Sequence, residues 1–127
     1  MAKDVTSKPL EGNQRELTTE EREFLLALVS RCSPERLGEV DRLVVLASFG
    51  FEHCPDLLFG NSFADEPVTK GAYLIADLVT PPDRNGFFGV MLWATDSRIT
   101  ELEIADYSLS EPSELPCASS LQPFVAT

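Results

Sequence analysis

The stretch GFFGVMLWATDSRITELEIADYS, residues 86–108, decides the fold, because it predicts two strands joined by a tight turn. Residues 87–94 form a continuous apolar run, and residues 99–107 alternate between apolar and polar side chains. The Thr-Asp-Ser-Arg sequence between them is rich in side chains that hydrogen-bond to nearby backbone at turns. We therefore expect an antiparallel hairpin here.

The two faces of this hairpin are expected to differ. In the second strand, Leu102 and Ile104 would point to one side, and Glu101 and Glu103 to the other. The apolar side should face the core and the acidic side should face water. Trp93 lies in the middle of the apolar run, and we expect it to be buried in the core.

Length and composition predict one domain with its own core, since the chain has 127 residues of which 43% are hydrophobic. No apolar run is long enough to cross a membrane, and the first 17 residues lack the apolar segment of a signal peptide. The three cysteines are an odd number without regular spacing. This pattern favours reduced thiols, and so we expect a cytoplasmic protein.

The formal net charge of −11 is unevenly distributed along the chain. Residues 61–127 contain ten acidic and three basic residues, whereas residues 18–60 contain eight and four. An acidic surface repels nucleic acids and anionic lipids, and it attracts a basic protein. The same charge could instead serve solubility alone.

The N-terminal part of the chain predicts an arm and two helices. Residues 1–16 are polar and lack periodicity, which predicts a mobile arm. Thr18 and Glu21 have the spacing of a capping box at the start of the first helix. Ser33 and Pro34 then suit the cap and the first position of a short second helix.

Three further strands are expected before the hairpin, at residues 43–51, 57–59 and 71–79. In the first of them, Val44 and Leu46 could also prolong the preceding helix. In the last, alternation places Leu74 and Leu78 on one side and Asp77 on the other. An Asn-Gly pair ends the turn that leads into the hairpin.

The order of elements predicts an α+β fold: two N-terminal helices packed on one face of a four- to five-stranded antiparallel sheet. No strand is followed by a helical crossover, so a parallel sheet is not expected. The domain should cover residues 17–116. Residues 117–127 should form a C-terminal tail, and the proline-rich chain after residue 108 should lack regular structure.

The acidic side chains of the strands are the candidate functional residues. Glu101, Glu103 and Asp77 could share one sheet face, where carboxylates can bind a metal or divide acid and base roles. Such a face is also the ordinary solvated side of an antiparallel sheet, and we interpret it as a binding surface. The predicted partner-binding residues are Asp77, Glu101, Glu103 and Asp106.

No pattern in the chain indicates catalysis, a metal or a cofactor. His53 and Cys54 are neighbours, which predicts a turn with a partly buried thiol instead of a zinc site or a Cys-His catalytic pair. The glycines match neither dinucleotide nor phosphate loops, and Gly89 should mark a bulge or close packing. The aromatic residues lack the basic neighbours of nucleic-acid binding surfaces. An enzyme would have to use His53 or the sheet carboxylates.

The segments LTTEEREFLLALVS (17–30), CPDLLFG (54–60) and GVMLWATDSRITELEIADYSLSEPSELP (89–116) resemble a group of small uncharacterised bacterial proteins. These proteins finish in a G-V-x-L-W…G-R-[IL]-x-E-L-E-[IV] hairpin and a proline-rich tail, and Ser97 here replaces the glycine before Arg98. The resemblance implies the fold but no activity. In size and acidity the chain is also similar to the immunity proteins of bacterial toxin systems.

Two functions are therefore expected. The first is a stoichiometric protein inhibitor of the immunity kind, whose acidic sheet face would meet a basic, nuclease-like toxin. The alternative is a small regulatory or ligand-binding module without catalysis, with a pocket between helices and sheet lined by Trp93, Tyr73 and phenylalanines.

Overall fold

The computed structural model describes residues 14–68, 70–108, 112 and 114–123. It confirms an α+β fold with a single antiparallel sheet, but the sheet has seven strands instead of four to five, in the order β1-β2-β3-β6-β5-β4-β7. The elements are β1 (Arg15–Glu16), α1 (Thr19–Cys32), the 3₁₀ helix η1 (Pro34–Arg42), β2 (Val44–Gly50), β3 (Pro55–Gly60), β4 (Tyr73–Val79), β5 (Gly86–Ala94), β6 (Ile99–Ser108), the 3₁₀ turn η2 (Ala118–Ser120) and β7 (Gln122–Pro123). Nowhere in these residues does a helix combine the length and apolar character needed to cross a bilayer.

The two additional strands, β1 and β7, lie in the segments expected as arm and tail. β1 pairs with β2, and β7 pairs with β4. Each contains two residues, too few to carry a periodic pattern in the sequence. Side-chain contacts hold the described residues at both ends: Arg15 binds Glu21 of α1 at 2.7 Å, and Arg31 donates to the carbonyl of Leu121 at 2.5 Å.

Helix α1 begins with the predicted capping box. The Thr18 hydroxyl accepts the amide of Glu21, and a Glu21 carboxylate oxygen accepts the amide of Thr18. At the other end, Pro34 begins η1 as expected, but the Ser33 side chain does not cap it. The Ser33 hydroxyl instead donates to the carbonyl of Ile75 in β4, and so joins the helical layer to the sheet.

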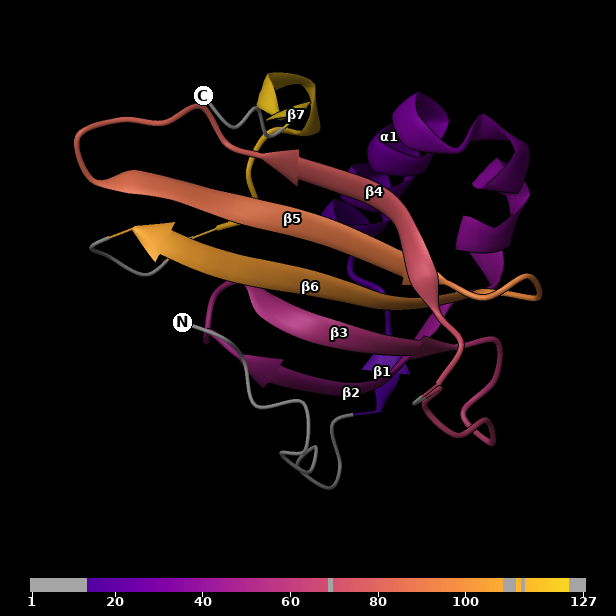
Figure 1. The fold of residues 1–127 in the computed structure, drawn as a ribbon. Coiled ribbons are helices and arrows are strands. Elements are labelled where there is room, and N and C mark those ends of the chain that lie inside the picture. Colours follow the sequence, from indigo (N-terminus) through magenta and orange to yellow (C-terminus); the bar gives the residue numbers. More distant parts are fainter. Residues whose placement is uncertain (1–13, 69, 109–111, 113, 124–127) are drawn as a thin grey trace.

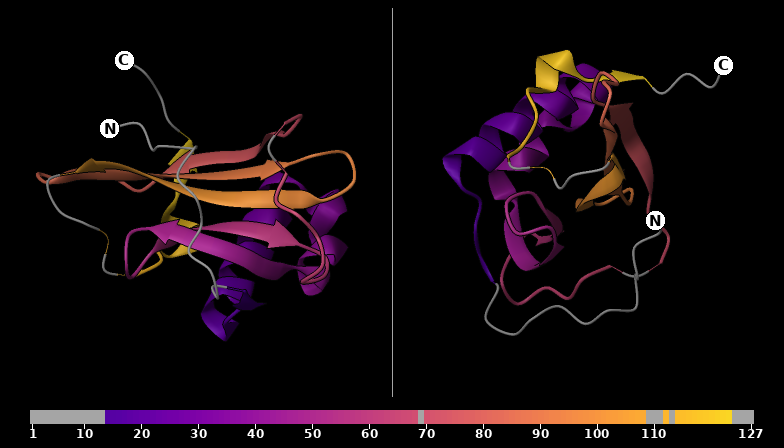
Figure 2. Two further views of the ribbon diagram at one scale, coloured as in Figure 1. Left: turned by 90° about the horizontal axis from the view of Figure 1, so that it is seen from below. Right: turned by 90° about the vertical axis from the view of Figure 1, so that its left-hand side faces the viewer.

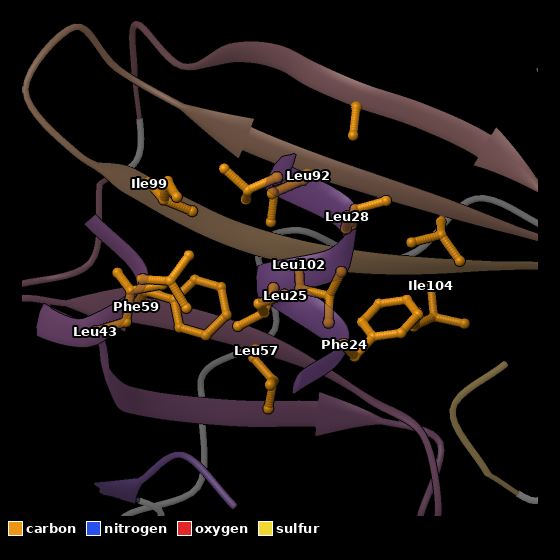
Figure 3. Packing of buried hydrophobic residues seen from close by; sticks show 14 of the residues in the cluster. Phe24, Leu25, Leu28, Leu43, Leu57, Phe59, Leu92, Ile99, Leu102 and Ile104 are labelled. Carbon is orange, nitrogen blue, oxygen red and sulfur yellow. The ribbon is translucent and has the colours of Figure 1, made fainter. Parts of the chain in front are cut away.

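The core lies between α1 and the sheet (Figure 3), and the predicted β5–β6 hairpin forms part of its sheet side. Alternation points Val90, Leu92, Leu102 and Ile104 inward, and each is at most 2% exposed. The side chains that meet them from the helix are the apolar residues of the α1 stripe, namely Phe24, Leu25, Leu28 and Val29. The assignment of Leu102 and Ile104 to the core is confirmed.

The helices cover only one side of the sheet. In Figure 1, α1 lies behind β4, β5 and β6, and the opposite face of these strands is turned toward the viewer. No helix of the described residues lies on that opposite face, which we call the outer face. The sheet is also strongly bent, because β2 and β3 lie on a different level from β5 and β6 when seen from below (Figure 2).

The bend occurs where β3 meets β6. These two strands pair at only two positions, Leu57 with Leu102 and Leu58 with Glu101. Two residues after Leu102, the amide of Ile104 donates to the buried side chain of Asp56 at 2.9 Å. A carboxylate oxygen therefore accepts this amide in place of a strand carbonyl, at the point where the register pairs of β3 and β6 end.

A bulge in β4 changes which residues share a face. The register shifts between Leu74 and Ala76, so that Leu74 lies opposite Trp93 and Asp77 lies opposite Met91. Leu74 and Asp77 are thus on the same face, whereas uninterrupted alternation placed them on opposite faces. The prediction for Leu74 was wrong because one extra residue, Ile75, inverts the alternation.

Candidate functional site

The outer face brings acidic and apolar residues together in two rows across β4, β5 and β6. One row is Asp77–Met91–Glu103, and the neighbouring row is Leu74–Trp93–Glu101. Two inter-strand spacings separate β4 from β6, which is about 9–10 Å. The carboxylates of Asp77 and Glu103 therefore project from the two sides of an apolar central strand.

Trp93 belongs to this face and not to the core, which corrects the sequence prediction. Its side chain is half-buried, and its indole Nε1–H donates to Oε1 of Glu103 at 2.9 Å. Inward and outward positions of β5 are both apolar, so the run of residues 87–94 gave no sign of its orientation. The polar edge of the indole ring needs a hydrogen-bond partner, and a carboxylate on the outer face supplies it.

At the far end of the hairpin, aromatic rings continue the apolar surface. Phe87 lies opposite Tyr107 in the register, with ring centroids 5.0 Å apart. A Cβ added to Gly89 would lie 3.3 Å from the Tyr107 ring, so this glycine allows the close packing that the sequence suggested. No register shift occurs at Gly89, and it is not a bulge.

These residues form what we call the apolar stripe: Phe87, Tyr107, Met91, Trp93 and Leu74. Leu74 is 39% exposed and Tyr107 is 55% exposed, both high for side chains of this size. None of the outward positions of β4, β5 or β6 is a lysine or an arginine. The outer face is thus an apolar stripe with acidic residues on both sides.

Three of the four predicted partner-binding residues, Asp77, Glu101 and Glu103, share the outer face. Asp77 is exposed, and the other two are partly buried. Asp106 does not join them, because it pairs with Phe88 in the uninterrupted β5–β6 register and lies on the side of Ile104. Strict alternation along residues 101–106 predicts this result, because it places residues 101 and 103 on one face of β6 and residue 106 on the other.

Tyr73 also lies away from the outer face, since its register partner is the inward-facing Ala94. Its hydroxyl donates to Asp96 at 2.9 Å and accepts from Arg36 at 3.2 Å. Arg36, which is buried, also donates to the carbonyl of Thr95 at 2.6 Å. This network joins η1 to the β5–β6 turn, and no periodicity in the sequence indicated it.

His53 and Cys54 lie in a bend between β2 and β3, as the sequence predicted, but the Cys54 thiol is fully buried instead of partly buried. The His53 side chain is 64% exposed, and Cys54 is buried. Burial raises the pKa of the Cys54 thiol to about 11, so that the thiol stays protonated at neutral pH. In the part of the chain that the structure describes, no three His, Cys, Asp or Glu side chains gather as metal ligands would.

A pocket of about 270 Å³ lies under the inner side of the hairpin. Phe88, Val90 and Ile104 form apolar parts of its wall, and Cys54 also lines it. Neither Trp93 nor Tyr73 lines it, so the pocket differs from the one expected from the sequence. A second pocket, of about 490 Å³, lies beside Arg15 and Glu21.

Comparisons with protein-family models, curated proteins and solved structures return no match for this chain. We therefore infer its function from the residues of the outer face.

Proposed function

We propose that the protein binds a basic protein partner through the outer face of β4, β5 and β6, and that it acts as a stoichiometric inhibitor of the immunity kind. The observation that carries this proposal is the apolar stripe with Asp77 on one side and Glu101 and Glu103 on the other. Tryptophan and tyrosine side chains are enriched at the energetic centre of protein interfaces, and charges at the rim help to select the partner.

The charge of the face supports a basic protein over other classes of partner. Phosphate backbones and anionic lipids would be repelled by it. A second copy of this chain is also disfavoured, because a two-fold interface would bring the carboxylates of Asp77, Glu101 and Glu103 against the same acidic patch. A basic protein surface can pack apolar side chains on the apolar stripe and place its cations beside the carboxylates. The net charge of −11 would speed the encounter with such a partner.

The inhibitor role rests on the same face. A protein that covers the basic cleft of a nuclease-like toxin needs an acidic, apolar-centred surface and no chemistry of its own. The size and acidity of the chain are similar to those of immunity proteins, and the carboxylates of Asp77, Glu101 and Glu103 lie on this face.

The test begins with capture of the partner from the native cell and continues with binding kinetics. The informative variant is Glu101→Gln/Glu103→Gln, because a glutamine at 103 can still accept the indole N–H of Trp93. The matched control is Glu23→Gln/Glu35→Gln, which removes two exposed charges from the helical layer. We expect the first variant to associate more slowly and with a weaker salt dependence, and the control to behave like the wild type.

Two results would count against this proposal. Equal association rates for the wild type and Glu101→Gln/Glu103→Gln would remove the outer face from the interface. If the captured partner has an enzymatic activity, that activity should fall to zero at a one-to-one ratio; an activity that is unaffected at saturation would exclude the inhibitor role.

The pocket under the hairpin supports a second candidate, a ligand-binding module without catalysis. Pockets for small ligands are mostly apolar with a few polar groups, as is the wall formed by Phe88, Val90 and Ile104. A thermal-shift screen with metabolites separates the two functions. Stabilisation by a small molecule that Phe88→Ala abolishes and Glu101→Gln/Glu103→Gln preserves would favour the pocket.

A further inference from the structure

The outer face has a shape that fits one kind of secondary structure. The apolar stripe follows β5 from Phe87 to Trp93, a length of roughly 20 Å at the rise of an antiparallel strand. Acidic side chains flank it on the neighbouring strands, Asp77 on β4 and Glu103 on β6, in one register row. The distance between these flanks, about 9–10 Å, is close to the width of an α-helix with its side chains, about 10–12 Å.

We propose that the partner docks an amphipathic α-helix along β5, with its apolar ridge on the stripe and lysine or arginine side chains on both flanks. This inference rests on the proposed function and names the element that the outer face recognises. About 14 helical residues would cover the length of the stripe. One flank of cations would meet Asp77, and the other would meet Glu101 and Glu103.

An extended strand fits the same face less well. The strands next to β5 are already paired with it along the stripe, so β5 offers no free edge for a further strand. A strand lying on the face would also place alternate side chains away from the surface, and its width would not reach both acidic flanks. A helix places residues i, i+3, i+4 and i+7 on one side and can carry cations along both borders of that side.

The fixed position of Trp93 is part of this recognition. The hydrogen bond to Glu103 sets the orientation of the indole ring. A cation placed between the ring and this carboxylate would be attracted by both. The flank on β6 should therefore contribute more to affinity than the flank on β4.

The experiment uses three peptides of about 16 residues with one composition of leucine, lysine and glutamine. The first has the helical period, the second alternates with the period of a strand, and the third is scrambled. Trp93 is the chain's single tryptophan, so its fluorescence reports binding to its surroundings, and labelled peptides report affinity by anisotropy. Circular dichroism measures the helix gained on binding.

We expect the helical-period peptide to bind about tenfold more tightly than either isomer, and to gain helix as it binds. Asp77→Asn should weaken the binding of this peptide, and Glu101→Gln/Glu103→Gln should weaken its binding more. Leu74→Ser should reduce binding by shortening the stripe, and Glu23→Gln/Glu35→Gln should leave it unchanged.

Other outcomes overturn the inference without deciding the proposed function. Equal binding of the three peptides would mean attraction by charge alone, which a basic partner could still use. If Glu101→Gln/Glu103→Gln weakens binding of the peptide and Asp77→Asn does not, a helix lying along β5 is excluded. If no peptide binds, the proposal that a helix docks on the outer face is wrong. The binding kinetics of the captured partner then test on their own whether the outer face is the interface.

Discussion

The Asp56 side chain replaces a strand carbonyl: its Oδ1 accepts the backbone N–H of Ile104 at 2.9 Å, within the buried boundary between β3 and β6. A carboxylate reaches farther from its own backbone than a carbonyl does. The amide of Ile104 is therefore satisfied while the two strands diverge, and the sheet can curve around α1 without leaving this donor unpaired.

Removal of this side chain should destabilise the fold. In Asp56→Ala the amide of Ile104 loses its acceptor inside the protein, and we expect a loss of about 1–3 kcal/mol in the free energy of unfolding. Asp56→Asn retains a carbonyl oxygen and should cost less. Urea denaturation measures both variants, and an alanine variant as stable as the wild type would show that β3 and β6 close against each other.

The pair formed by Arg15 and Glu21 should make stability dependent on pH. Burial alone would raise the pKa of Glu21, but the hydrogen bonds from Arg15 and from the Thr18 amide outweigh it, and the pKa lies below its ordinary value. The carboxylate thus favours the folded state when it is ionised. Its contribution is complete above the unfolded pKa of about 4.3 and is lost as the pH falls through the lower folded pKa.

We therefore expect Glu21→Gln to lower the free energy of unfolding by about 1–3 kcal/mol at pH 7. The difference in this free energy between the variant and the wild type should become smaller toward pH 3. Denaturation curves at several pH values give this difference directly. Arg15→Gln should show the same narrowing, because it removes the other half of the pair. A gap that stays constant over this range would show that the charge of Glu21 does not act through Arg15.

The three free cysteines should differ in their reaction with thiol reagents. Cys117 is exposed, and the hydrogen bond from Ser119 lowers the pKa of its thiol. Burial raises the pKa of Cys54 to about 11 and also blocks access. At pH 8 we expect Cys117 to be modified first and Cys54 only on unfolding.

Mass spectrometry of the labelled protein, with and without urea, measures this order. Cys117→Ser should eliminate the fastest phase and leave the slower ones. Modification of Cys54 in the native protein at its rate in urea would contradict the buried environment of this thiol.

Leu92 and Trp93 are neighbours in β5 but should differ in what they contribute to stability. Leu92 is fully buried, and Leu92→Ala should cost about 2–5 kcal/mol. Trp93 lies on the outer face with only part of its surface covered, so Trp93→Ala should cost less than Leu92→Ala despite the larger side chain removed. Thermal or urea unfolding measures the stability of both variants. A larger loss of stability in Trp93→Ala than in Leu92→Ala would show that Trp93 is buried in the core.

The predictable parts of this fold are those in which one segment contains its own signal. Thr18 and Glu21 predicted the start of α1, because a capping box is complete within four residues. The β5–β6 hairpin was likewise predictable, since both strands and their turn are adjacent in the sequence. The inward positions Leu102 and Ile104 followed from alternation next to charged residues.

The errors concern residues whose position depends on distant parts of the chain. Arg15 has no apolar pattern, and its place in β1 is set by its pairing with Val45 of β2. Leu74 changed faces through a bulge whose carbonyl, that of Ile75, is bound by Ser33 from the helical layer. Three of the four candidate site residues were placed together by alternation and pairing, and Asp106 was separated from them by the same rule.

The short junction between β3 and β6 also has a mechanical consequence. Nine register pairs join β5 to β6 and six join β2 to β3, but two join β3 to β6. The sheet thus consists of two long ladders joined by a short one, and amide hydrogen exchange should detect the two long ladders as separate cooperative units. A helix bound along β5 should slow exchange throughout β4, β5 and β6, while the amides of β2 continue to open at the rate of the free protein.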